Sequence, residues 1–284
     1  MDLYWYLAIL AVVAIAAGFV GSLTGIGGGI IIIPVLVIFF NVPLVVAIGA
    51  SVITILANSA TTGSAYLRDR LTDLRIGMFL EIATVPGAII GAVATVYLVH
   101  ADLADALLVA LGIILILLAI AGLKRIRDES QTTVVPDRIS RRLGLGGFYH
   151  DVHLDRTVHY QAENTKRALG IMFGAGLVAG MFGIGSGVLK VTALDEALKL
   201  PIKVSTATSN FMIGVTACAT TGVLLAAGYV NAVLAAPVAI GATAGSLIGS
   251  YMLPGMRSRS IRVAFTAVLV GLSIELIIRG LGGL

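Results

Sequence analysis

Two short glycine clusters interrupt long apolar stretches of the chain. The first reads Gly25-Ile26-Gly27-Gly28-Gly29, and the second reads Gly183-Ile184-Gly185-Ser186-Gly187. They lie inside the apolar runs 3–40 and 168–198. Because glycine is a poor helix former, each cluster is predicted to break the helix around it.

The composition places these breaks in a membrane protein. Of the 284 residues, 58% are hydrophobic and only 12% are charged, and the mean hydropathy is +1.03. An ordinary soluble domain has about 25% charged residues. This excludes soluble enzymes, nucleic-acid-binding modules and disordered chains, and the single cysteine excludes an intrachain disulfide. We therefore expect an all-α, polytopic protein of the cytoplasmic membrane.

Eight apolar segments are visible, in two groups of four. A membrane-spanning helix needs about 20 apolar residues, so six segments read as single spans and the two glycine-broken ones are anomalous. The arms after the glycines, 30–40 and 188–198, would be only about 16 Å long, which favours re-entrant hairpins over full crossings. The segments are 3–40, 44–66, 76–99, 103–123, 168–198, 204–227, 232–252 and 261–281.

The two groups of four are related by an internal duplication. The glycine clusters lie 158 positions apart, and the same offset matches Ser51 with Ser209, Gly87 with Gly245 and Gly91 with Gly249. Self-similarity at a fixed offset indicates structural repeats. We predict a first membrane repeat over 1–123, a polar connector over 124–167 and a second repeat over 168–284.

The positions of Lys and Arg predict the orientation. If the basic loops are cytoplasmic, 18 of the 19 positive residues lie inside, and Arg279 is the exception. Each repeat must then cross the membrane an odd number of times, so the second repeat is inverted relative to the first. Three spans follow each glycine-broken hairpin, both termini are expected outside, and the 124–167 connector is expected in the cytoplasm.

Paired breaks at equivalent positions predict a central binding site. Non-helical backbone at membrane depth is tolerated where it is buried in protein or lines a cavity, and helix N-termini attract anions. The alternative is that the glycines only permit close helix packing. The candidate substrate ligands are Gly25, Gly27, Gly28, Gly29, Ser51, Asn58, Gly183, Gly185, Ser186, Gly187, Ser209 and Asn210.

Charged residues inside the spans are few. Glu81 is expected near the cytoplasmic interface and is a weak candidate for proton coupling, while Lys190 is expected to extend towards the cytoplasm. Glu275 has Arg279 as an i, i+4 partner. Sodium coupling and a homo-oligomer stay open, and neither a nucleic-acid partner nor a cofactor is expected.

The connector contains three of the four histidines. The spacing of His150, Asp151, His153, Asp155 and His159 fits no metal motif. We expect no metal site here, and a solvated loop with a short hairpin over 147–161.

These features resemble the TauE/SafE sulfite exporter family. The resemblance is carried by the GIGGG break at 25–29, its GIGSG copy at 183–187, the Gly49-Ala50-Ser51 run with Thr54, and Pro86-Gly87-Ala88 with Gly91. It implies a secondary transporter, usually an exporter, of sulfite, sulfoacetate or related organosulfur anions.

Our mechanistic hypothesis is alternating access around a midplane anion site. A passive anion channel built on the same backbone amides is the alternative. An enzyme is not expected, because a Ser186 nucleophile would need a base and no histidine lies within a span.

Overall fold

The computed structural model describes residues 3–24, 27–124, 136–151, 156–252 and 258–283. The chain is almost entirely helical, as predicted, with one small two-stranded sheet. Its elements are α1 (Leu3–Thr24), α2 (Gly29–Phe40), α3 (Leu44–Arg68), α4 (Leu74–His100), α5 (Ala104–Lys124), α6 (Arg138–Leu143), β1 (Gly146–Asp151), β2 (Arg156–Gln161), α7 (Thr165–Phe182), α8 (Gly187–Thr192), the π-helix η1 (Ala193–Ala197), α9 (Ile202–Ala226), α10 (Ala232–Met252) and α11 (Ser258–Gly283).

Several helices have the length and composition of membrane spans. Among the described residues, five helices qualify: α3, α4, α5, α9 and α10. The apolar part of α1 over Ala8–Ser22 and the whole of α2 are shorter. At 1.5 Å per residue the 12 residues of α2 extend about 18 Å, little more than half the hydrocarbon thickness. The prediction of an all-α, polytopic membrane protein is confirmed.

Both glycine clusters break their helices. α1 ends at Thr24 and α2 begins at Gly29, while α7 ends at Phe182 and α8 begins at Gly187. The equivalent residues Gly27 and Gly185 have φ angles of 75° and 71°. This left-handed region is open to glycine and strained for residues with a Cβ. The predicted interruptions are therefore present, and the backbone reverses direction through positive φ angles.

The pairs of packed helices are related by the 158-residue offset, because each helix pair has an equivalent pair made of the corresponding helices. α1 packs along α10, and α7, the equivalent of α1, packs along α4, the equivalent of α10. α3 packs on its equivalent α9, and α5 packs on its equivalent α11. A duplicated chain would give this pattern. The repeat boundaries and the inversion of one repeat relative to the other remain predictions.

Small residues bring the paired helices into backbone contact. A Cβ at Gly176 or Gly180 of α7 would overlap the carbonyl oxygens of Thr84 or Ala88 in α4. In the equivalent pair, a Cβ at Gly245 of α10 would overlap the carbonyl oxygen of Ile15 in α1. Without a hydrophobic force between helices in lipid, such close approach supplies the packing energy.

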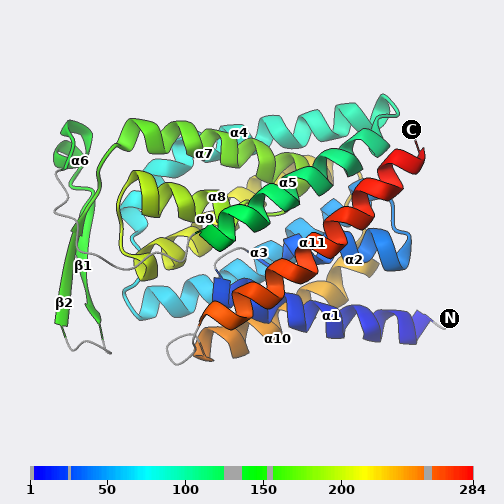
Figure 1. Cartoon of the computed structure of the whole chain (residues 1–284), viewed down its shortest axis with the longest axis horizontal. Coiled ribbons are helices and arrows are strands. Elements are labelled where there is room, and N and C mark those ends of the chain that lie inside the picture. The colour runs from blue at the N-terminus through cyan, green and yellow to red at the C-terminus, as the bar shows by residue number, and fades with distance from the viewer. Residues whose placement is uncertain (1–2, 25–26, 125–135, 152–155, 253–257, 284) are drawn as a thin grey trace.

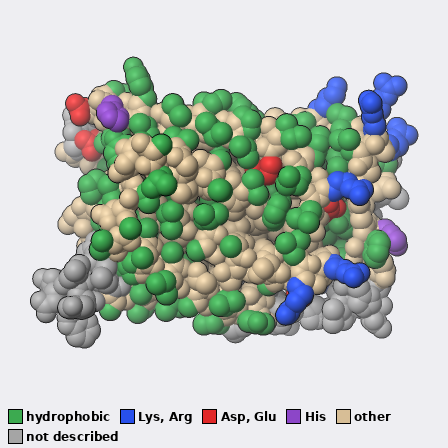
Figure 2. Space-filling view, turned by 180° about the vertical axis from the view of Figure 1, so that it is seen from behind, with side chains coloured by type: hydrophobic (Ala, Val, Ile, Leu, Met, Phe, Trp, Pro, Cys, Tyr) green, Lys and Arg blue, Asp and Glu red, His purple; other side chains and the backbone are tan. Residues whose placement is uncertain are grey.

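The two ends of the molecule differ in charge. Both termini lie at one end of the bundle, and α6 with the β1–β2 hairpin lies at the other (Figure 1). Figure 2 shows Lys and Arg side chains gathered at the hairpin end, with apolar side chains across the middle of that face. Ile82 in α4 and Ile240 in α10 are examples of large apolar side chains that are exposed on the molecule. An apolar belt with one basic end is typical of a membrane protein.

The connector contains the predicted hairpin. β1 and β2 pair antiparallel, with Phe148 opposite His159. The expectation of a solvated loop was wrong for its inner face, because Leu145 and Tyr149 are buried against residues of α4, α7 and α9. The Tyr160 hydroxyl also donates a 3.1 Å hydrogen bond to Asp73 Oδ2 beside the start of α4. The connector therefore caps the basic end of the bundle.

No metal site was expected in the connector. Within the part of the chain that the structure describes, no group of three or more His, Cys, Asp or Glu side chains could hold a metal ion. His153 and Asp155 lie outside the described residues.

The close α4–α7 contact can be tested with two alanine substitutions in one helix. Gly180→Ala should destabilise the protein by about 1–3 kcal/mol, because its Cβ meets the α4 backbone. Gly170→Ala in α7 is the matched control, since its Cβ would meet nothing within 4 Å. Thermal unfolding in detergent measures both, and equal melting temperatures for the two variants would contradict the packing.

Candidate functional site

The two helix breaks meet at a pair of isoleucines. A Cβ at Gly27 would lie 3.3 Å from Ile213 Cγ2, and one at Gly185 would lie 3.2 Å from the same atom. Both positions also approach Ile55, at 3.9 Å and 3.6 Å from its Cγ2. Ile55 in α3 and Ile213 in α9 are each 1% exposed and are equivalent under the 158-residue offset. The breaks therefore converge on one point, which this isoleucine pair fills.

Ser51 connects the two breaks. Its hydroxyl donates a 2.8 Å hydrogen bond to the carbonyl oxygen of Gly183 in the second break. Ser51 Oγ also lies against Gly29, at the start of α2 after the first break, where an added Cβ would overlap it. Ser51 is fully buried in α3. That Ser51 binds the substrate stays a prediction.

Two predicted site residues carry buried polar atoms without a partner. Ser186 Oγ and Asn58 Oδ1 make no hydrogen bond, and their residues are 0% and 1% exposed. Ser186 belongs to the second break and has a φ of 45°. Asn58 lies beside the first break, because a Cβ at Gly21 would overlap Gly28 N and lie 3.1 Å from Asn58 Nδ2. Buried polar groups are nearly always paired, and an unpaired one costs stability, so both atoms are candidates to bind a ligand.

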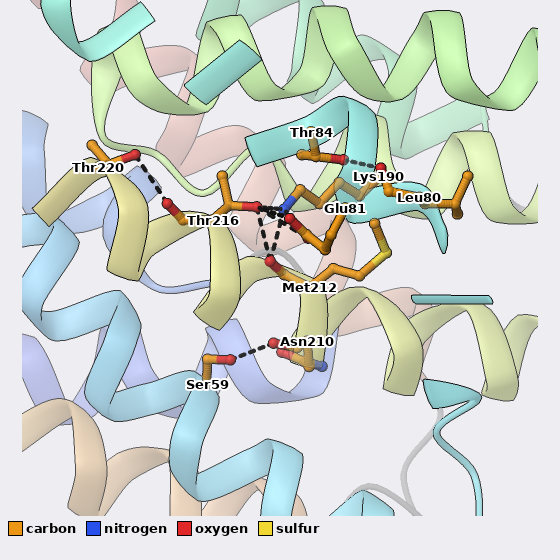
Figure 3. A network of polar contacts seen from close by, with 9 residues as sticks. All are labelled: Ser59, Leu80, Glu81, Thr84, Lys190, Asn210, Met212, Thr216 and Thr220. Carbon is orange, nitrogen blue, oxygen red and sulfur yellow. Dashed lines mark hydrogen bonds and ion pairs between the residues drawn. The ribbon is translucent and has the colours of Figure 1, made fainter. Parts of the chain in front are cut away.

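The remaining predicted ligands are placed differently. Gly28 and Gly187 are buried at the starts of α2 and α8, and Ser209 is buried in α9. Asn210 donates through Nδ2 to Thr206 O within its own helix, and its carbonyl accepts from Ser59 Oγ (Figure 3). The Asn210 side chain is thus used inside α9. Gly25 lies outside the described residues.

A buried ion pair lies one turn beyond the second break. Lys190 Nζ is 3.5 Å from Glu81 Oε1 and donates a 3.0 Å hydrogen bond to Met212 O. Thr216 Oγ1 lies 3.2 Å from both carboxylate oxygens and also contacts Lys190 Nζ (Figure 3). Lys190 is 0% exposed and Glu81 is 5% exposed. The pair joins α4, α8 and α9 at the side of the isoleucine pair.

Glu81 is buried, and its position near the cytoplasmic interface stays a prediction. The arrangement corrects one expectation, because Lys190 is fully buried and does not extend to water. The physical reason is pairing: once the carboxylate, a threonine hydroxyl and a backbone carbonyl satisfy the ammonium, the side chain no longer needs water. The Glu275–Arg279 pair formed as expected, at 3.2 Å. Arg279 also donates to the Val37 and Ile38 carbonyls and so holds the end of α2 against α11.

Sequence reasoning missed the isoleucine pair and the role of Thr216. A signal was present for both. Ile55 and Ile213 are identical residues at the 158-residue offset, and Asn58 and Thr216 are both polar at equivalent positions. The isoleucine pair was missed because isoleucine is common in apolar spans and does not by itself indicate a site. The role of Thr216 was missed because it depends on the contact of Glu81 with Lys190, which are more than a hundred positions apart in the sequence.

The site combines neutral polar groups with one ion pair. Backbone at the two breaks, the Ser51 and Ser186 hydroxyls and the Asn58 amide surround the isoleucine pair, and Lys190 is the charged donor beside it. Such a set can bind the oxygens of a small anion without fixing a net charge.

Comparisons with known proteins identify a matching family and several relatives. The family described as "Sulfite exporter TauE/SafE" matches residues 10–276. Three curated proteins of Bacillus subtilis (strain 168) are similar. "Probable membrane transporter protein YunE" is 30% identical over 96% of this chain and 98% of its own length. "Probable membrane transporter protein YjnA" is 26% identical over 91% and 96%, and "Probable membrane transporter protein YdhB" is 24% identical over 85% and 86%.

No solved structure matches the chain significantly. The family and the relatives together indicate a multi-pass membrane transporter rather than an enzyme. With the matching region covering nearly all of the membrane part, and both helix breaks inside it, the chain belongs to the sulfite exporter TauE/SafE family.

Proposed function

We propose that the protein is a secondary transporter that exports small anions, such as sulfite, sulfoacetate or related organosulfur compounds. The anion binds where the two helix breaks meet. The observation that carries this proposal is the convergence of both breaks on Ile55 and Ile213, with the unpartnered oxygens Ser186 Oγ and Asn58 Oδ1 beside the breaks. The name of the matched family supports the substrate class.

The proposed ligands suit an oxyanion. In the first turn of α2, Ile31 and Ile32 donate to the Gly28 carbonyl, so Gly29 and Ile30 are the candidate amide donors, and the helix dipole adds partial positive charge there. The Ser186 hydroxyl can donate, and a half-turn of the Asn58 amide presents its NH2 group. Hydrogen bonds from neutral donors to an anion are charge-assisted and directional, so such a site can still select an anion by its shape.

Alternating access would require the isoleucine pair to open on one side at a time. The proposed inverted repeats provide two equivalent gates, one for each break. Support comes from the exchange of helix pairings under the 158-residue offset, and from the two termini lying at the end opposite the connector (Figure 1). The basic end is proposed to face the cytoplasm.

A passive anion channel is the second candidate. The fully buried Ile55–Ile213 pair has the character of a hydrophobic gate that closes by excluding water. Saturable flux with counterflow would favour the carrier, and ohmic single-channel currents would favour the channel.

The substrate class can be tested with purified protein in liposomes. We expect saturable flux of at least one anion among sulfite, sulfate, thiosulfate and sulfoacetate, with taurine as a zwitterionic comparison. Flux no greater than in protein-free liposomes for every compound would contradict the proposal. Unaltered flux after leucine replaces both Gly27 and Gly185 would contradict the site.

The unpartnered polar atoms allow a sharper test of the site. Ser186→Ala removes a buried hydroxyl that has no partner, so stability should stay equal or rise by about 1 kcal/mol, while anion flux should fall about tenfold. Asn58→Leu should behave similarly. Thr221→Val is the matched control, because Thr221 Oγ1 is also buried and unpartnered but lies in α9 away from the breaks. Its flux should be that of the wild type, and equal flux in all three variants would argue against ligand binding at Ser186 and Asn58.

The proposed orientation predicts the outcome of a topology map. A reporter fused after Tyr229, between α9 and α10, should lie outside the cell, and one fused at Ser258, at the start of α11, should lie inside. Alkaline phosphatase, which is active outside, and a fluorescent protein that folds inside give opposite signals. Both fusions reporting the same side would contradict a membrane crossing by α10 and with it the proposed orientation.

A further inference from the structure

The Glu81–Lys190 pair places one carboxylate and one ammonium beside the proposed anion site. The Lys190 backbone N–H donates a 3.1 Å hydrogen bond to the Ser186 carbonyl, so Lys190 lies one helical turn after the second break. Thr216 holds both charged groups, and Ile213, three residues before it on α9, contacts both breaks. The ion pair and the breaks thus share the same segment of α9.

The charges in this part of the molecule are few. Lys190 of α8 reaches Glu81, and α4 packs mainly on α7 and α9. Smaller contacts join α4 to α3 and α5, whose charged residues Arg68, Asp105 and Lys124 lie in the first or last turns of those helices. Lys190 from α8 faces Glu81, whereas the other charged residues of α7 and α9, Lys166, Arg167 and Lys203, lie in the first turns of their helices. The neighbouring η1 carries Asp195 and Glu196, which are half-buried and exposed. Glu81 and Lys190 therefore balance each other, and the local net charge is zero when both are ionised.

Neutrality is the physical constraint on such a pair. A single uncompensated charge in a dry membrane interior is strongly unfavourable, whereas a matched pair is tolerated. An anion that enters beside an intact Glu81–Lys190 pair would bring one unbalanced negative charge. If a proton neutralises Glu81 at the same time, Lys190 becomes free to pair with the anion, and the loaded site is again neutral.

We propose that Glu81 is the proton-coupling residue and that Lys190 exchanges its carboxylate partner for the substrate. Each cycle then moves one proton together with one singly charged anion in the same direction, without net charge, so export follows the outward gradient of the anion and not the membrane potential. Both the empty site, with Glu81 and Lys190 ionised, and the site loaded with proton and anion are neutral and can change their exposure. A site that holds only the proton or only the anion carries a net charge, and this charge prevents it from changing its exposure from one side of the membrane to the other. This inference rests on the proposed function and adds the coupling ion and the charge of the cargo.

Thr216 is placed to guide this exchange. Its hydroxyl contacts Lys190 and lies 3.2 Å from both carboxylate oxygens, and it can donate to a carboxylate or accept from an ammonium. It therefore remains hydrogen-bonded whether Glu81 is charged or neutral. The Met212 carbonyl, at 3.0 Å from Lys190 Nζ, likewise keeps the ammonium partly satisfied while its carboxylate partner changes.

The experiment measures anion and proton movement in the same vesicles. The full-length protein is reconstituted with the pH dye pyranine inside, and an inward gradient of radiolabelled sulfite or methanesulfonate is imposed without a pH gradient. Methanesulfonate carries one fixed negative charge near neutral pH, so a proton that enters with it must come through the protein. For methanesulfonate we expect internal acidification with one proton per anion, and no effect of a potassium–valinomycin membrane potential; sulfite serves to measure anion flux only, because bisulfite itself releases protons near neutral pH.

Variants separate coupling from binding. In Glu81→Gln the empty site keeps an unpaired Lys190 charge and cannot return, so net flux and acidification should fall at least about tenfold, while exchange of internal for external anion should stay within about threefold of the wild type. Lys190→Gln should lose both net flux and exchange. Glu81→Asp keeps the titratable group and should retain coupled transport, which guards against a folding defect in Glu81→Gln.

Glu275→Gln is the matched control, because it removes the carboxylate of the other helix ion pair, 3.2 Å from Arg279 and partly exposed. It should retain one proton per anion. Wild-type anion flux without proton movement, or undiminished net flux and acidification in Glu81→Gln, would overturn the inference and leave the proposed transport function standing. Failure of the wild type to move either anion would contradict both.

Discussion

Backbone that leaves the helix inside a membrane must find its partners in the protein, and this requirement organises the structure. Lipid provides no hydrogen bonds, so the two interruptions between Thr24 and Gly29 and between Phe182 and Gly187 cannot face it. The structure packs them against one another. Ile55 and Ile213 contact both breaks, and Ser51 touches Gly29 while it binds the carbonyl of Gly183. The non-helical backbone of the two breaks is thus enclosed by protein.

The helix pairs around this centre explain how it is held. α3 and α9 supply the isoleucines, Ser51 and Thr216, and they pack on each other. On either side, α4 with α7 and α1 with α10 approach so closely that glycine is required at the contact. Arg279 fixes the end of α2 through the carbonyls of Val37 and Ile38. Each short arm after a break is therefore anchored by a longer helix.

The duplication has not kept the two halves chemically equal. Under the 158-residue offset Lys190 corresponds to Ile32, Thr216 to Asn58 and Glu81 to Ala239. The ion pair, unlike the breaks and the isoleucines, therefore has no counterpart in the equivalent positions. The first half contributes Asn58 with its unpartnered Oδ1, and the second half contributes Lys190, whose charge is paired with Glu81. A symmetric scaffold thus surrounds an asymmetric polar site, which is what a transporter needs if it is to couple two different solutes.

The sequence by itself determined the membrane class, the two helix breaks, the duplication and the short hairpin in the connector, because composition, glycine clusters and a fixed offset are properties of the chain alone. It also pointed to Ser51, Asn58 and Ser186. Only the tertiary structure decided that the breaks converge on Ile55 and Ile213, that Asn210 is used within its own helix, and that the connector packs Tyr149 into the core. It also reversed the expectation for Lys190. A lone lysine in an apolar helix is predicted to extend to water. Lys190 does not, because Glu81 pairs with it from a helix more than a hundred residues away in the sequence. No local sequence pattern predicts the position of that carboxylate.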